Sequence, residues 1–120
     1  MSYASTLVLK DRAAANVNYV RLKSDASQVV YGLQSAPLNT PTLLTIGHQM
    51  TSSPTGSDRH LVKIARTVLD SSNKPCTAVM NFTLSIPRVG VVRNDIDDII
   101  AGLKEFLATA NVDALLRGEL

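Results

Sequence analysis

The sequence has little of what small secreted, zinc-binding or membrane proteins depend on. It contains one cysteine, so no disulfide can form within the chain and a disulfide-stapled secreted fold is excluded. Cys76, His48 and His60 are too few soft ligands for a structural zinc site. No apolar run approaches the roughly 20 residues that span a bilayer. The first residues lack the basic start and apolar stretch of a signal peptide, so we expect a soluble protein made inside the cell.

Motifs for catalysis and cofactor binding are also missing. There is no Gly-x-Ser-x-Gly nucleophile elbow and no phosphate-cradling glycine loop, so we expect no enzyme activity, no catalytic residue and no cofactor. His48 and His60 fall on the apolar face of expected strands, where a histidine is more often a buried, hydrogen-bonded residue than a base. The acids of residues 94–98 lack the spacing of a calcium loop, and helix capping explains them. An enzyme that uses one of the histidines is the third alternative.

What the sequence does contain is a large apolar fraction and an uneven distribution of charge. At 120 residues and 45% hydrophobic, it predicts one domain, residues 1–120, and excludes a disordered chain. Residues 1–94 carry ten Lys and Arg against four acids, whereas residues 95–120 carry two against six. Chance and helix-end chemistry explain most of the acidic end. The alternative is a mildly basic body that suits a polyanion.

Strands are expected in the first two thirds of the chain. Six β-prone runs are separated by loops rich in Pro, Gly, Ser and Asp. In the last three runs, apolar and polar residues alternate, which is typical of antiparallel strands covered on one side only. Pro87 ends the last run because it cannot donate to a ladder. The runs span residues 6–9, 16–23, 28–33, 42–51, 59–69 and 76–86.

Two helices are expected after residue 93. Asn94 is the expected N-cap, followed by acids in the first turn, where they favour the helix dipole. Apolar residues then recur with helical spacing from Ile96 to Ala110. Asn111 indicates a break before a short second helix, which Gly118 closes.

This order of elements predicts an α+β fold with strands first and helices last. About five paired strands form a sheet about 24 Å wide, and the residues after 93 are too few to cover its apolar face. We therefore expect an obligate oligomer in which each chain's helices cover the other chain's sheet. The expected dimer-interface residues are Ile99, Ile100, Leu103, Phe106, Leu107, Leu115 and Leu116.

The polar face of the last three expected strands gathers hydrogen-bonding groups and positive charge without an acid. Such a surface suits RNA, because phosphates meet the cations and unstacked bases meet the amides and hydroxyls. The alternative is an ordinary solvated sheet face, and no aromatic residue lies there to act as a stacking platform. The candidate RNA-binding residues are Thr45, Gln49, Arg59, Lys63, Asn81, Thr83 and Ser85.

Two stretches are similar to those of a known family. Residues 81–87 read Asn-Phe-Thr-Leu-Ser-Ile-Pro, close to a family strand of Asn/Met-Glu-Leu-Thr-Ile-Pro character that leads through a short linker into a helix. Residues 107–116 resemble the junction of that family's two helices. With the order of elements and the length, the chain resembles the coat proteins of small single-stranded RNA bacteriophages, the levivirus type. The resemblance implies an N-terminal β-hairpin, a five-stranded antiparallel sheet and two C-terminal helices.

The resemblance also implies how the protein acts. Two chains would form an interlocked dimer with a continuous ten-stranded sheet, and dimers would assemble in the bacterial cytoplasm into a small icosahedral shell, the T=3 virion capsid. The sheet would face the genome and bind an RNA hairpin that overlaps the replicase start, which represses translation. The loop at residues 70–75 would line the symmetry axes of the shell, and Cys76 beside it would be placed for a disulfide between subunits. The partners are therefore further copies of the chain and single-stranded viral RNA, with no membrane.

Residue by residue, the match to the family is partial. Asn81 and Lys63 match RNA-contacting residues, and Thr45 matches a threonine of an adenine pocket. Gln49 stands where relatives often have a basic residue, and Leu61 replaces a polar pocket residue. Where some relatives place a stacking tyrosine, this chain has Val79. The alternative is a dimeric RNA- or DNA-binding regulator that never forms shells.

Overall fold

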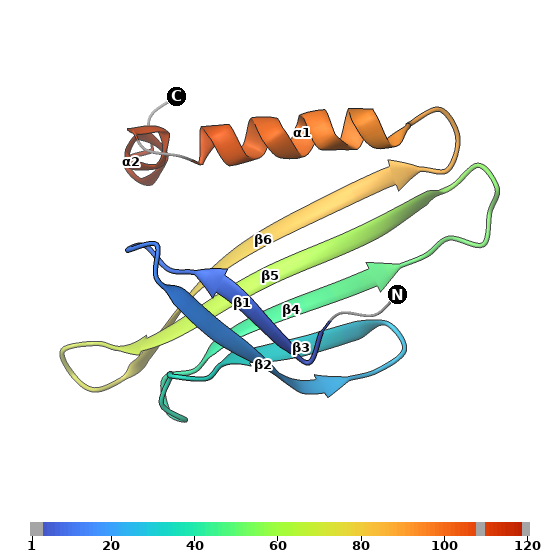
Figure 1. Cartoon of the computed structure of the whole chain (residues 1–120). Coiled ribbons are helices and arrows are strands. Elements are labelled where there is room, and N and C mark those ends of the chain that lie inside the picture. The colour runs from blue at the N-terminus through green and yellow to red at the C-terminus, as the bar shows by residue number, and fades with distance from the viewer. Residues whose placement is uncertain (1–3, 108–109, 119–120) are drawn as a thin grey trace.

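Six strands are followed by two helices in the computed structural model, which describes residues 4–107 and 110–118 (Figure 1). The six runs expected from the sequence are the six strands, with bounds shifted by up to two residues. The strands are β1 (Thr6–Lys10), β2 (Asn16–Ser24), β3 (Gln28–Leu33), β4 (Thr42–Gln49), β5 (Ser57–Leu69) and β6 (Pro75–Pro87).

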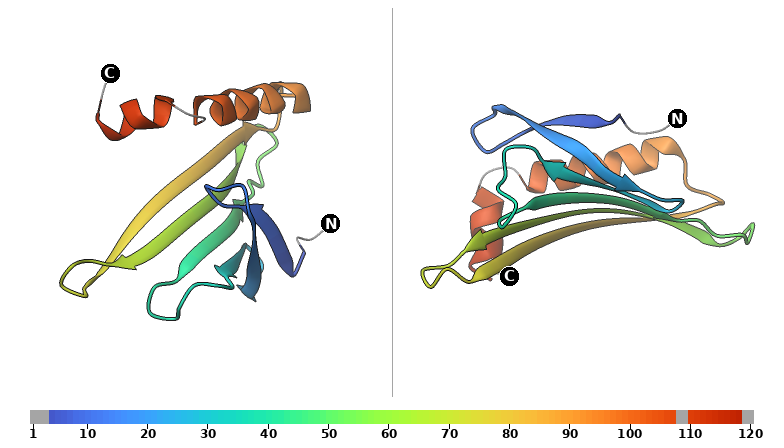
Figure 2. Two further views of the ribbon diagram at one scale, coloured as in Figure 1. Left: turned by 60° about the vertical axis from the view of Figure 1, so that its left-hand side comes forward. Right: turned by 90° about the horizontal axis from the view of Figure 1, so that it is seen from below.

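All six strands form one antiparallel sheet in the order of the sequence. The expected α+β class is confirmed, but the strand count differs slightly from a hairpin plus a five-stranded sheet. The hairpin β1–β2 is part of the same ladder, because β2 also pairs with β3. The sheet is strongly twisted, so β1 and β2 curl over one face of the remaining strands (Figure 2).

The core lies beneath this curled hairpin. Tyr19 on β2 packs with Tyr31, Leu44 and Ile46 of the next two strands, and all four are buried. The Tyr31 side chain is fully buried, and its hydroxyl donates a 2.6 Å hydrogen bond to the backbone oxygen of Ala4. The core is therefore confined to one end of the sheet, because β1–β3 supply its cover.

An aspartate organises each of the hairpin connections except the loop between β3 and β4. Asp11, Asp25 and Asp70 begin the turns that follow β1, β2 and β5, and Asp58 closes the loop between β4 and β5. Each carboxylate accepts hydrogen bonds from backbone N–H groups of its own turn or loop, which is the chemistry that favours Asp in turns. The donors are Ala13 and Ala15 for Asp11, Ser27 and Gln28 for Asp25, Ser72 and Lys74 for Asp70, and Thr51 for Asp58, all at 2.8–3.0 Å.

Helix α1 (Arg93–Phe106) begins two residues earlier than expected. The N-cap is Val92 and not Asn94, because the Asp95 carboxylate accepts the Val92 N–H at 3.1 Å and so satisfies the helix end from inside the first turn. Helix α2 (Ala110–Leu116) includes Asn111, which was expected to precede it. Residues 108–109, where the junction between the helices was expected, lie outside the described part of the chain.

The two helices follow the sheet in the chain, and α1 is not buried against it. Helix α1 runs beside β6 and on the same side of the sheet as the hairpin β1–β2 (Figures 1 and 2). No residue of α1 is buried. Gly118, with φ of +72°, ends α2 in the left-handed conformation that glycine adopts without strain, as expected. One face of β5 and β6 and the apolar stripe of the helices therefore remain uncovered.

Candidate nucleic-acid interface

The seven side chains expected to bind RNA come together on one face of β4, β5 and β6. Residues directly opposite one another in an antiparallel ladder share a face, and the register places the seven in three neighbouring rows. The central row contains only one of the seven, Thr83, and its other two residues are Gly47 and Leu61. The rows are Thr45–Lys63–Asn81, Gly47–Leu61–Thr83 and Gln49–Arg59–Ser85.

This polar face is accessible to a ligand. Gln49, Arg59, Asn81, Thr83 and Ser85 are exposed. Across the strands the three rows span about 10 Å, and along them about 14 Å, from the standard spacings of a sheet. A surface of this size accommodates a few nucleotides rather than a single ion. The remaining two residues of the set, Thr45 and Lys63, are half-buried.

A shallow hollow of about 300 Å³ lies in the middle of this face. It exists because Gly47 has no side chain between the longer residues of the neighbouring rows. Leu61 provides an apolar surface in it, while Arg59, Gln49 and Gln28 provide polar groups at its border. Gln28, on β3, was missed by the sequence reasoning, since the expected site stopped at the next strand. The register, in which Gln28 lies opposite Gly47, brings it to the same face.

The positive charge of the polar face has no acidic neighbour on that face. Asp58 is the one acid in β4–β6, and it lies opposite Ile86 on the other face. Within the described residues, neither Lys63 nor Arg59 forms an ion pair; the ion pairs present there join Arg88 to Asp58 and Arg93 to Asp97.

The four acids of residues 1–94 are all engaged by turns and loops. Because backbone N–H groups favour the charged form of a carboxylate, hydrogen bonds from Ser27 and Gln28 lower the pKa of Asp25. The pKa of Asp58 is lowered mainly by the Thr51 N–H and also by Arg88. Six of the ten Lys and Arg residues of this region lie on strands, whereas three of its four acids lie in turns and Asp58 lies near the start of β5.

His48 and His60 form a pair on the opposite face. They lie opposite each other on β4 and β5, and their Nδ1 atoms are 2.8 Å apart, so one ring donates a hydrogen bond and the other accepts it. The rings meet edge to face with centroids 5.0 Å apart. The expectation that both are buried is wrong: His48 is exposed and His60 half-buried, because the apolar cover ends before this end of the strands.

Three further features concern metal binding, membrane spanning and the single cysteine. No group of three or more His, Cys, Asp or Glu among them is placed to hold a metal ion. None of the helices in that part of the chain is long and apolar enough to cross a membrane. Cys76 is exposed at the start of β6, with its Sγ 3.9 Å from a carboxylate oxygen of Asp70 in the adjacent turn.

The architecture defines a class by its fold. One antiparallel sheet has a bare polar face, a hairpin curls over the other face, and two C-terminal helices leave the sheet. This is the fold of the coat proteins that build levi-like phage particles.

Three solved structures illustrate the likeness. The virus-like particle of bacteriophage AVE019 has a TM-score of 0.81 at 12% identity, over 99% of this chain and 97% of that chain. The particle of bacteriophage ESE058 has a TM-score of 0.74 at 16% identity, over 94% of both chains. The bacteriophage EMS014 coat protein has a TM-score of 0.69 at 20% identity, over 91% of this chain and 79% of that chain. No protein-family model and no curated protein matches the sequence, so the similarity lies in the fold.

Proposed function

We propose that this chain is a phage coat protein that forms dimers, assembles into a small icosahedral shell and binds single-stranded RNA on the polar face of its sheet. The observation that carries the proposal is that no residue of α1 is buried in the described part of the chain, despite the apolar stripe of that helix. Apolar helices of this kind need a partner surface to be stable in water. A second copy of the chain supplies one.

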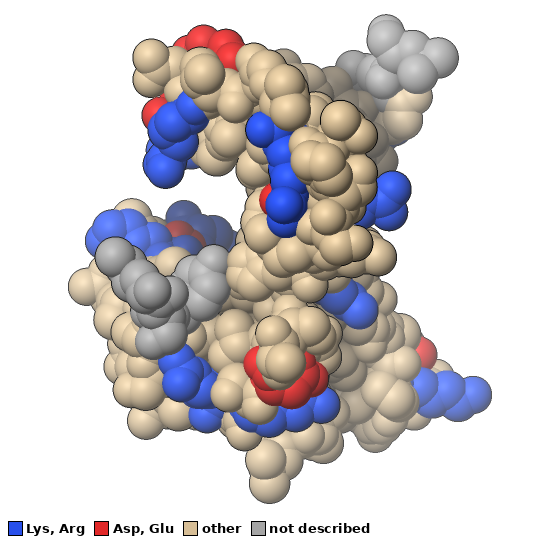
Figure 3. Space-filling view, turned by 90° about the vertical axis from the view of Figure 1, so that its right-hand side faces the viewer, with Lys and Arg blue, Asp and Glu red and all other residues tan. Residues whose placement is uncertain are grey.

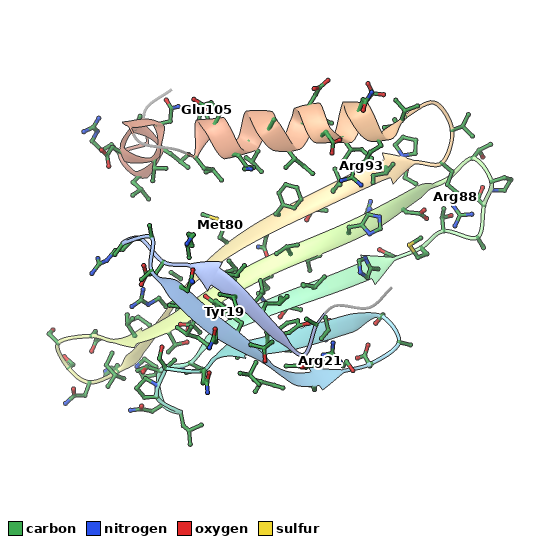
Figure 4. The ribbon with its side chains drawn as sticks, viewed as in Figure 1. Tyr19, Arg21, Met80, Arg88, Arg93 and Glu105 are labelled. Carbon is green, nitrogen blue, oxygen red and sulfur yellow. The ribbon has the colours of Figure 1, made fainter. Side chains whose placement is uncertain are left out.

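Exposed apolar side chains on two layers support the dimer. On the helices, Ile99 is 58% exposed and Leu116 is 79% exposed. On the facing strands, Met80 is 59% exposed and lies on the side of β6 that is turned toward α1 (Figure 4). An open hollow separates α1 from the strands (Figure 3). A second copy that places its own helices in this hollow would bury both layers, at about 1.5–3 kcal/mol for each large apolar side chain fully buried.

Strand β6 indicates how the two copies meet. It is an outer strand of the sheet, is 13 residues long, and pairs with β5 along one edge only. A long, unpaired edge strand is a template for further pairing. Antiparallel pairing of β6 with β6 of a second copy about a two-fold axis would continue the sheet through both chains. Each chain's helices would then lie over the other's strands.

The shell is supported by the phage particles that share the fold. Their structures are virus-like particles, that is, closed assemblies of many copies. In this proposal the chain would act as one domain of a T=3 virion capsid and would assemble in the bacterial cytoplasm. It would work by self-association and RNA binding, without chemical turnover.

Binding of RNA is supported by the polar face. Lys63 and Arg59 would contact phosphates, and Thr45, Gln49, Asn81, Thr83 and Ser85 would bind sugar hydroxyls and base edges. In the proposed dimer this face would lie on the side of the sheet opposite the helices. The acid-free composition of the face favours a polyanion over a protein partner of mixed charge.

Repression of replicase translation would require selective binding of one RNA hairpin. The departures at Gln49, Leu61 and Val79 favour contacts that do not depend on sequence, because they remove a charge, a polar pocket group and a stacking ring. Competition between a genomic hairpin and an unrelated hairpin of equal length tests this. A preference of at least about tenfold, about 1.4 kcal/mol, would support repression, and equal affinities would contradict it.

The decisive experiment combines electron microscopy with absorbance. The chain is expressed in bacteria, and the size-exclusion peak is examined by negative staining and by its 260/280 nm ratio, before and after nuclease treatment. The chain has no Trp and three Tyr, so packaged RNA would dominate the ratio. Uniform shells with a high, nuclease-resistant ratio are expected.

Other outcomes separate the alternatives. A dimer-sized peak that binds RNA but forms no particle would favour the non-assembling regulator. A folded monomer at micromolar concentration would contradict the dimer, and empty shells that bind no added RNA when reassembled would contradict the RNA site alone.

A further inference from the structure

Strand β2 contains a register shift between Arg21 and Lys23. Arg21 lies opposite Tyr31, on the face that carries the core, whereas Lys23 lies opposite Val30. In a regular strand, residues two apart point to the same side, so without the shift Lys23 would share the face of Arg21. Leu22 is the extra residue, a β-bulge, and it moves Lys23 to the opposite face of the sheet.

A close contact supports the bulge from the neighbouring strand. A Cβ atom placed on Gly32 would lie 2.9 Å from Cδ1 of Leu22, closer than carbon atoms approach. The missing side chain of Gly32 therefore makes room for Leu22 above β3. Gly32 lies opposite Leu43 on β4, two residues from Thr45, so the Leu22 side chain lies over the polar face of the sheet.

The shift places Lys23 in the same row as the central residues of the polar face. Val30 is opposite Thr45, Thr45 is opposite Lys63, and Lys63 is opposite Asn81. The row therefore runs Lys23–Val30–Thr45–Lys63–Asn81 over five strands. Its two cations are three strand spacings apart, about 14 Å, with no acid between them.

We propose that Lys23 is a further RNA-phosphate contact, and that the bound strand crosses the sheet along this row, from β6 to β2. The inference rests on the proposed function and extends it by naming the direction of the RNA and a residue beyond β4–β6. Lys23 is exposed. Asp25 is the acid nearest to it in the chain. Hydrogen bonds from the Ser27 and Gln28 backbone hold that carboxylate in the following turn, where the charge of Lys23 acts on it more weakly than those hydrogen bonds do.

The test compares single charge-removing variants. Lys23→Gln and Lys63→Gln each remove one cation of the row. Arg66→Gln is the matched control, because Arg66 lies on the same strand as Lys63 but opposite Thr42 and Ala78, on the other face. RNA-free, unassembled protein is titrated against a fluorescein-labelled, unstructured RNA of about 20 nucleotides, and anisotropy is recorded from about 50 to 300 mM salt.

The slope of log K against log salt is the readout. Loss of one phosphate contact should make it shallower by about 0.7 for each of Lys23→Gln and Lys63→Gln, and by about 1.4 for the double variant. Lys23→Arg should retain the parental slope, and Arg66→Gln should leave it unchanged. Thermal unfolding checks that Lys23→Gln is folded.

The possible failures are distinguishable. If Lys63→Gln lowers the slope and Lys23→Gln does not, the extended track is wrong and the proposed RNA face remains. If neither variant differs from Arg66→Gln, the polar face is not the RNA site.

Discussion

Ala14 and Asn73 occupy the same position in two turns of the same construction, and both have left-handed backbone conformations, with φ of 60° and 59°. In the first turn the Ala14 N–H donates to the Asp11 backbone oxygen at 3.0 Å. In the second, the Asn73 N–H donates to the Asp70 backbone oxygen at the same distance. Asparagine tolerates this conformation, whereas alanine is strained in it.

Ala14 is therefore a site where stability can be gained. Ala14→Gly, which removes the Cβ, and Ala14→Asn, which reproduces the second turn, should each raise the free energy of unfolding by about 0.5–1 kcal/mol. Equilibrium urea unfolding measures it. Asn73→Ala is the reciprocal change and should lower stability by a similar amount. A loss of stability in both Ala14 variants would contradict the shared turn geometry.

Asp58 predicts a dependence of stability on pH. Its pKa is lowered in the folded chain by the Thr51 N–H and Arg88. A carboxyl with a lowered folded pKa contributes its full stabilisation above its unfolded pKa, and the contribution is lost as pH falls through the folded pKa. Asp58→Asn should therefore be less stable at pH 7 and should lose less stability than the parent between about pH 5 and pH 2.

Urea unfolding at a series of pH values checks this prediction. Asp113→Asn on α2 is a control for the loss of a charge, since that residue lies away from the loop between β4 and β5. Equal pH dependence in the parent and in Asp58→Asn would mean that the Thr51 hydrogen bond contributes nothing to stability.

Leu103 tests the role of the helical stripe. It is 37% exposed in the single chain, but the proposed dimer buries it. Leu103→Asp places a charge in that interface, at a cost of several kcal/mol, and should convert the dimer into monomer or aggregate in sedimentation velocity. Ala101→Asp is the matched control. It introduces the same charge two positions away, about 200° around the helix from Leu103. Ala101 therefore shares a face with Glu105, four residues later, which points away from the sheet (Figure 4). If the two variants assemble equally well, the stripe is not the interface.

Gly32 and Leu22 should behave as a coupled pair. Gly32→Ala brings a Cβ against Leu22 and should destabilise the chain by about 1–3 kcal/mol, as overpacking does. Leu22→Ala removes the atoms that collide, so the double variant should recover part of that loss. A double-mutant cycle of unfolding free energies measures the coupling. Additive effects would contradict close packing of the two residues.

Much of the secondary structure could be predicted because it is encoded locally. Runs of β-prone residues marked the first three strands, alternation with a period of two marked the last three, and the change to helical spacing marked α1. The helix N-terminus was misplaced because a carboxylate at Asp95 caps from within the helix, so the apolar Val92 can be the N-cap. The seven candidate RNA residues could be grouped on one face from alternation alone, because β4–β6 are regular and pair in register.

Two features could not be predicted from the sequence because they depend on contacts between distant parts of the chain. Alternation assigns Lys23 to the core face, and only the pairing of β2 with β3, with Leu22 over Gly32, brings it to the polar face. The exposure of His48 and His60 likewise depends on where the apolar cover of the sheet ends.

The sequence by itself determined the order of strands and helices, the face on which polar groups gather, and the excess of apolar helix that a single chain cannot bury. These follow from local spacing and from composition. The tertiary structure alone decided the register shift in β2, the hollow around Gly47 and the hydrogen bonding of the acids of residues 1–94 to turns and loops, away from the polar face. The physical reason is that register and close contact are set by pairing between strands, which a pattern along one strand does not contain.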